Sequence, residues 1–102
     1  MRHFQLTHAA HRDIAEIWRY IARDSFDAAD PVTDAIYESC ALPANSPLVG
    51  QRRPDVTRSD FRFWNVPSFR NYTIVYDPES RPIRIVRIFH GARNIRRELR
   101  RK

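Results

Sequence analysis

The chain has 102 residues, of which 42% are hydrophobic and 12% aromatic, as in a globular domain rather than a disordered chain. It has a single cysteine, Cys40, no apolar run near the roughly 20 residues of a membrane span, and no apolar leader, which excludes an internal disulfide, a membrane anchor and a secretory signal. We therefore expect one cytoplasmic domain over residues 1–102 that has no membrane partner.

Charge is unevenly distributed along the chain. Residues 1–49 contain four arginines and seven acids, whereas residues 50–102 contain fourteen basic residues and five acids, within a net charge of +6. Seventeen of the eighteen basic residues are arginine, whose planar guanidinium suits phosphates and carboxylates. The basic half predicts an acidic partner, either a nucleic acid or an acidic protein segment. A simple solvated basic surface is the alternative.

The N-terminal part of the chain predicts a strand and a helix. Residues 3–6 alternate weakly between polar and apolar and suggest a short strand. Thr7 is a suitable N-cap for a helix over residues 8–24. The apolar residues of this segment recur at helical spacing and form one stripe: Ala10, Ile14, Ile17, Trp18 and Ile21.

The next segment predicts a second helix and then a long loop. We expect this helix to become regular at Pro31, because proline suits the first helical position, although a turn could begin at Asp27. Pro43 should end or kink it, and the two helices should form an antiparallel hairpin. Residues 44–60 are rich in proline and arginine and have almost no apolar residues, so we expect a loop.

Three strands are predicted in the second half, at residues 61–66, 69–76 and 83–90, each rich in aromatic and β-branched side chains. Their short connections indicate an antiparallel meander. Both faces carry apolar groups, so the hairpin should cover one face and something else the other. The expected α+β fold is an N-terminal edge strand, a helical hairpin, the three-stranded meander and a short C-terminal helix that begins near Asn94.

Four segments in this order resemble ParE-like toxins of the RelE/ParE superfamily. They are LTHAAHRDIAEIWRYIA at 6–22, PLVG at 47–50, NYTIVY at 71–76 and IVRIFHGARNI at 85–95. The resemblance covers nearly the whole chain. The chain departs from the family pattern at Pro31 and Pro43, where such toxins usually continue a helix, and at Asn94, where aspartate is common.

The resemblance implies the toxin of a type II toxin–antitoxin system, a plasmid-stabilisation type of function. Such a toxin would inhibit DNA gyrase by binding, without catalysis, cofactor or small-molecule ligand, and a ParD-like antitoxin would neutralise it. Operator DNA would be contacted only through that antitoxin. We expect the basic tail to bind the target: Arg93, Arg96, Arg97, Arg100 and Arg101.

For the antitoxin, we expect a segment that wraps the uncovered sheet face and the outer side of the hairpin. Trp64 and Tyr72 need cover on that face, and the arginines would meet antitoxin acids. The expected contact residues are Trp18, Arg62, Trp64, Arg70, Tyr72 and Arg84.

Two other functions stay open. An mRNA endonuclease of the RelE type would need a proton acceptor, a proton donor and a cation at the phosphate. His90, Arg62, Arg87 and Arg93 are the candidates, although the chain has no tyrosine after Tyr76. A basic nucleic-acid-binding module would explain the charge alone. No metal site is expected, because His8 and His11 have no third ligand nearby in the sequence.

Overall fold

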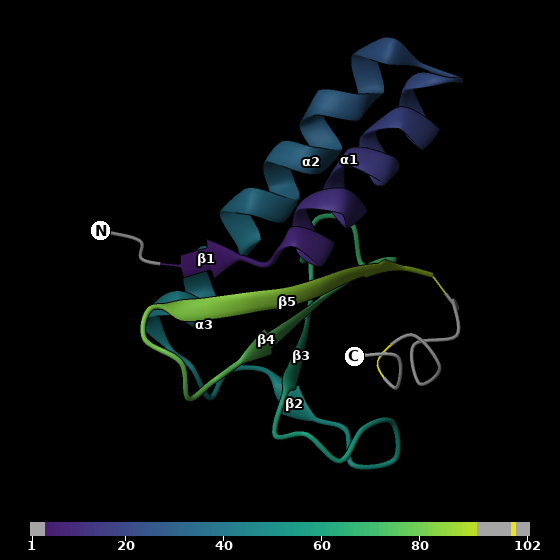
Figure 1. Ribbon diagram of the computed structural model, residues 1–102. Coiled ribbons are helices and arrows are strands. Elements are labelled where there is room, and N and C mark those ends of the chain that lie inside the picture. Colours follow the sequence, from purple (N-terminus) through teal and green to yellow (C-terminus); the bar gives the residue numbers. More distant parts are fainter. Residues whose placement is uncertain (1–3, 92–98, 100–102) are drawn as a thin grey trace.

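The computed structural model describes residues 4–91 and residue 99. Within residues 4–91, three helices and five strands follow one another (Figure 1). They are β1 (Phe4–Leu6), α1 (His8–Ala22), α2 (Phe26–Ser39), α3 (Ala41–Asn45), β2 (Gln51–Arg52), β3 (Arg62–Asn65), β4 (Tyr72–Asp77) and β5 (Ile83–His90). The predicted order of strand, helical hairpin and meander is confirmed.

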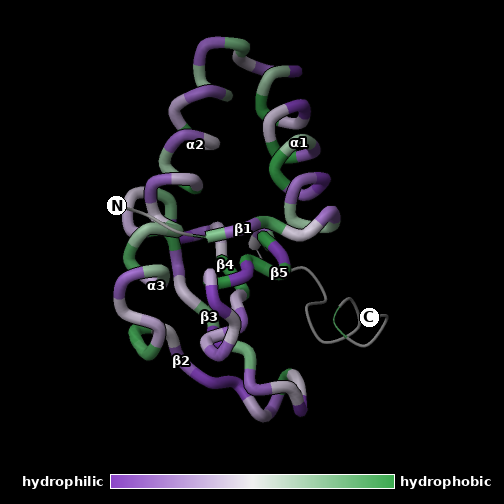
Figure 2. The backbone as a smooth tube through the Cα atoms, turned by 60° about the vertical axis from the view of Figure 1, so that its left-hand side comes forward, coloured by the Kyte–Doolittle hydropathy of each residue, from purple (hydrophilic) through white to green (hydrophobic). Residues whose placement is uncertain are grey.

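The strands form one mixed sheet in the order β1-β5-β4-β3-β2. β1 runs parallel to β5, with Phe4 opposite Ile83 and Leu6 opposite Ile85, and the other neighbours are antiparallel. β1 lies at one edge, as predicted. The other edge is β2, a two-residue strand inside the predicted loop; its exposed, hydrophilic residues (Figure 2) give no strand-like pattern.

Helix α1 begins where the Thr7 cap predicts it. The Thr7 hydroxyl accepts a hydrogen bond from Ala10 N (3.1 Å) and donates one to Val86 O (2.8 Å). One side chain therefore both caps the helix and attaches it to β5. The helix ends at Ala22, two residues earlier than expected.

The prediction for the start of α2 was wrong. The helix begins at Phe26, where the Ser25 hydroxyl accepts a hydrogen bond from Ala28 N (3.3 Å), and Pro31 lies inside it. Proline removes one backbone donor there, but the buried side chains on both sides of it, such as Ala29 and Val32, pack into the protein. That packing offsets the local cost. Pro43 lies in α3, after α2 has ended.

The strand boundaries also move. β4 begins at Tyr72 rather than at residue 69, because residues 66–71 form a turn in which Phe69 N donates to Val66 O and Tyr72 N to Phe69 O. The expected C-terminal helix lies, apart from Leu99, outside the described residues. In the described part of the chain no helix is long and apolar enough to cross a membrane.

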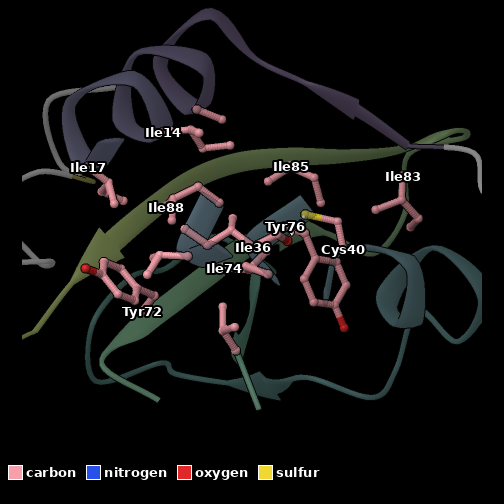
Figure 3. Packing of buried hydrophobic residues seen from close by; sticks show 13 residues of the cluster. Ile14, Ile17, Ile36, Cys40, Tyr72, Ile74, Tyr76, Ile83, Ile85 and Ile88 are labelled. Atoms are coloured by element: carbon pink, nitrogen blue, oxygen red, sulfur yellow. Dashed lines mark hydrogen bonds between the residues drawn. The ribbon is translucent and has the colours of Figure 1, made fainter. Parts of the chain in front are cut away.

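The helical hairpin covers one face of the sheet (Figure 1), and the main core lies between them. Figure 3 shows side chains of both helices meeting those of β4 and β5: Ile14, Ile17, Ile36, Cys40, Tyr72, Ile74, Tyr76, Ile83, Ile85 and Ile88. A second cluster on other strand side chains contains Phe63, Val75, Val86, Phe89 and Leu99. The prediction that both faces of the sheet carry apolar side chains is confirmed. The second face was expected to need cover from a partner, but its cluster is already buried within the chain, with Val56 and Phe61 packed against it.

Candidate functional site

The edge of β5 is closed in two different ways. β1 pairs only with Ile83–Ile85, so within the described chain the rest of β5 has a neighbouring strand on one side alone. Beyond Ile85, helix α1 and its cap supply the hydrogen bonds. The Thr7 hydroxyl donates to Val86 O (2.8 Å), and the Asp13 carboxylate accepts from Ile88 N (2.9 Å). The side chains of Thr7 and Asp13 thus form the hydrogen bonds that a neighbouring strand would otherwise form with this part of β5.

Asp13 also holds Arg87. The guanidinium donates through Nε (2.8 Å) and Nη2 (3.0 Å) to the two carboxylate oxygens, and the side chains are only 15% and 11% exposed. Arg87 lies over the Phe89 ring as well, 4.8 Å from its centroid. This bidentate, largely buried geometry is the strong form of an ion pair. To bind a phosphate, the Arg87 guanidinium would have to break its ion pair with Asp13.

Past Ile88 the edge of β5 opens into a cleft of about 500 Å³ between α1 and the ends of β4 and β5. We call it the α1–β5 cleft. It combines charged, aromatic and apolar side chains. The lining residues are Asp13, Glu16, Ile17, Arg19, Tyr20, Arg23, Tyr72, Ile88 and His90.

Three aromatic rings line the α1–β5 cleft, one from α1 and two from the strands. His90 stacks on Tyr72, with centroids 4.7 Å apart and planes at 19°, and Tyr20 lies 6.2 Å from His90 at 53°. Tyr72 is buried at the end of the core near Ile17 (Figure 3), and burial, with a smaller contribution from Tyr20, raises the pKa of its hydroxyl. Tyr20 is 59% exposed. The cleft therefore has a fixed floor and one accessible ring.

Two of the predicted antitoxin contacts lie on the other face from the one expected. Tyr72 belongs to the core under the helices, and Trp64 packs against that core. Both therefore lie on the side of the sheet that faces the helices, and the uncovered-face prediction was wrong for both. Among the described residues, Trp64 Nε1 is a buried donor without a hydrogen-bond partner.

Arg62 holds a loop in place. Its Nη1 donates to Gly50 O (2.7 Å) and Leu48 O (3.4 Å). Nearby, the Tyr76 hydroxyl donates to Pro47 O (2.6 Å) and accepts from Gly50 N (2.9 Å). A Cβ on Gly50 would lie 2.8 Å from that hydroxyl oxygen, so only glycine fits. Residues 47–50, one of the segments that resemble ParE-like toxins, are thus held in place by the side chains of Arg62 and Tyr76.

The remaining predicted contacts come from separate parts of the fold. Trp18 on α1 donates from Nε1 to Asp30 (2.8 Å) and meets the edge of Phe26, which is 69% exposed. Arg70 is exposed in the turn before β4, and Arg84 is exposed near the start of β5, away from His90. The structure does not gather these three into one site.

Some predicted residues are not in the described part of the chain. The target-binding arginines Arg93, Arg96, Arg97, Arg100 and Arg101 lie outside it. Within residues 4–91 and 99, no three metal-ligating side chains come together, and His8 and His11 remain a pair without a third ligand.

Sequence reasoning missed most of the α1–β5 cleft. Asp13, Glu16, Tyr20 and Arg23 recur at intervals of three and four, which places them on one side of a helix. That spacing could have been noticed. What it could not give is the opposite wall, because His90 is 70 positions further along the chain than Tyr20.

A helical hairpin on one face of a mixed sheet, with an edge strand that is only partly paired within the described chain, defines a small domain of α+β class. It is similar in structure to a chain described as the chromosomal ParDE toxin–antitoxin system from P. aeruginosa. The TM-score is 0.72 at 18% identity, over 89% of this chain and 97% of that one. No curated protein matches the sequence.

The family is shown by sequence. A family model described as the ParE toxin of the type II toxin–antitoxin system parDE matches residues 4–95. The chain belongs to the ParE toxin family.

Proposed function

We propose that this toxin arrests growth by binding DNA gyrase, with no catalytic step of its own, and that a ParD-like antitoxin neutralises it. Membership of the ParE toxin family supports the toxin role. The structural neighbour is described as a ParDE toxin–antitoxin system, which supports an antitoxin as the partner.

The contacts made by the candidate catalytic side chains favour a binding function over a catalytic one. Among the described residues, Arg87 is held by Asp13, Arg62 by the carbonyls of Leu48 and Gly50, and the His90 ring is stacked on Tyr72. A ribonuclease needs an acid, a base and a cation converging on one phosphate. These three side chains instead hold the fold together.

For the target, we propose contacts from the basic tail. Residues 93–102 contain six basic residues and one acid, a density suited to an acidic surface or to the DNA that gyrase holds. Trp18, Arg70 and Arg84 remain proposed antitoxin contacts; they are spread over the fold, so an antitoxin that meets all three would have to wrap around the toxin.

The test compares two targets. Purified toxin is incubated with gyrase and supercoiled DNA, and separately with mRNA in a translating extract. We expect cleaved DNA–gyrase complexes and intact mRNA. Replacing Arg96, Arg97 and Arg100 with glutamine should reduce the gyrase effect at least tenfold. The control replaces Arg52, Arg53 and Arg58 with glutamine, an equal loss of charge on exposed residues of β2 and the loop after it, and should change it less than threefold. Cleavage of mRNA that His90→Ala abolishes would establish the ribonuclease instead.

A further inference from the structure

We propose that the α1–β5 cleft receives an extended acidic segment of the antitoxin, which lies along the open edge of β5 and directs a carboxylate to Arg19 and Arg23. The inference rests on the proposed function, because it takes the partner to be the antitoxin. It names the site and the chemistry by which that partner is recognised.

The backbone of β5 supplies the first argument. Gly91 N donates to Asn71 O (2.7 Å), so by the alternation of an antiparallel ladder the peptide groups of residues 89 and 91 point to β4 and those of Ile88 and His90 point away from it. Ile88 N confirms the direction by donating to Asp13 on α1. The next groups along this edge, Ile88 O and His90 N, face the side where β5 has no neighbouring strand among residues 4–91. Such an edge is a template for an added strand.

Charge supplies the second argument. In the described part of the chain neither Arg19 nor Arg23 forms an ion pair with a carboxylate; the Arg23 guanidinium lies over the Tyr20 ring, 5.8 Å from its centroid. Of the two acids in the cleft, Asp13 is already neutralised by Arg87, and Glu16 is exposed. Two exposed arginines against one exposed acid favour a partner that brings a carboxylate.

The rings supply the third argument. Tyr20 is 59% exposed beside the fixed stack of His90 on Tyr72. Because side chains of a strand alternate, a strand on β5 would place every second side chain towards these rings and the others towards the opposite face of the sheet. An apolar or aromatic side chain that covers Tyr20 would be buried at the centre of the contact, where such residues contribute most to affinity.

A peptide fits this cleft better than a nucleic acid does. A polynucleotide would stack on Tyr20 and meet the arginines, but it has no backbone N–H groups to pair with Ile88 O. The exposed carboxylate of Glu16 in the cleft wall would also repel its phosphates. The same carboxylate does not obstruct a peptide, whose acids can be spaced to avoid it.

The test measures the Kd of the full-length toxin for its co-encoded antitoxin by calorimetry. The variant Arg19→Glu/Arg23→Glu should bind at least thirtyfold more weakly, and Tyr20→Ala about tenfold more weakly. Arg12→Glu is the matched control, because Arg12 is exposed on the same helix but does not line the cleft; it should change Kd less than threefold. All these side chains are exposed, and thermal melts should confirm that each variant folds.

Two further measurements separate a direct contact from general electrostatics. Replacing an antitoxin acid with lysine should recover at least tenfold of the affinity lost in Arg19→Glu/Arg23→Glu. Hydrogen exchange at the His90 amide should slow at least tenfold in the complex. Tight wild-type binding that the double variant leaves unchanged, or a His90 amide that stays unprotected, would overturn this inference and leave the proposed function standing. A toxin that does not bind its antitoxin at all would overturn both.

Discussion

The two halves of the β5 edge differ in how their backbone groups are satisfied. Residues 83–85 pair with β1, a strand, whereas Val86 and Ile88 are served by the side chains of Thr7 and Asp13. A strand uses backbone alone, but the second arrangement needs a hydroxyl, a carboxylate and a buried arginine in place. The comparison shows where the protein depends on single side chains, and one of them, Asp13, lines the α1–β5 cleft.

Removing Asp13 should have the largest effect on stability. Asp13→Ala leaves Arg87 as a largely buried cation without its carboxylate and Ile88 N without its acceptor, and we expect a loss of about 3–5 kcal/mol in the free energy of unfolding. Urea denaturation measures it. Asp60→Ala removes an exposed ion pair with Arg52, in which the nitrogen and oxygen lie 3.3 Å apart, and should cost at most about 1 kcal/mol. Equal losses in the two variants would mean that burial of the Asp13–Arg87 pair is unimportant.

The loop before β2, near the other edge of the sheet, depends on a side chain in the same way. Tyr76→Phe removes the hydroxyl that bonds Pro47 O and Gly50 N. Both partners are left without their hydrogen bond in a poorly solvated site, so we expect a loss of about 1–3 kcal/mol. Tyr37→Phe, a change at a residue that is 38% exposed, is the control and should be nearly neutral. A harmless Tyr76→Phe would show that the loop is held by Arg62 alone.

Thr7 allows the two bonds of one side chain to be separated. Thr7→Val removes both the cap on α1 and the bond to Val86 O, and it should lower the free energy of unfolding by about 1–2 kcal/mol. Thr7→Asp keeps an acceptor for Ala10 N but has no proton for Val86 O. If the edge of β5 needs the hydroxyl, chemical denaturation of Thr7→Asp will show only partial recovery; full recovery would mean that capping is the whole contribution.

Cys40 gives a comparison within the core, away from any edge. Burial raises the pKa of the thiol from its ordinary value of 9.0 to about 12, because the interior disfavours the thiolate. As pH rises the unfolded chain ionises first, so stability is complete below about pH 9 and falls between about pH 9 and 12. At pH 10 the loss is about 1 kcal/mol. Cys40→Ala should abolish this slope between pH 8 and 10, although it lowers stability at every pH; an unchanged slope would assign it to tyrosines.

Local chemistry in the sequence determined much of the fold. The Thr7 cap and the apolar stripe from Ala10 to Ile21 define α1, and runs of β-branched and aromatic residues define the meander, because both signals arise from neighbours within a few residues. The family resemblance rested on these same segments. Local preference failed at Pro31, where burial of the surrounding side chains outweighs one lost hydrogen bond, and at β2, which exists only because β3 offers an edge.

Only the tertiary structure decided the site. Alternation along a strand shows that Tyr72, Ile74 and Tyr76 share a face, but with apolar residues on both faces it cannot show which face the helices cover. Contacts between residues far apart in the chain could not be predicted from the sequence either. Asp13 meets Arg87 across 74 positions, and Tyr20 meets His90 across the α1–β5 cleft. These contacts arise because β5 is longer than β1, and α1 lies beside the part of the β5 edge that β1 does not reach. This arrangement follows from how whole helices and strands pack.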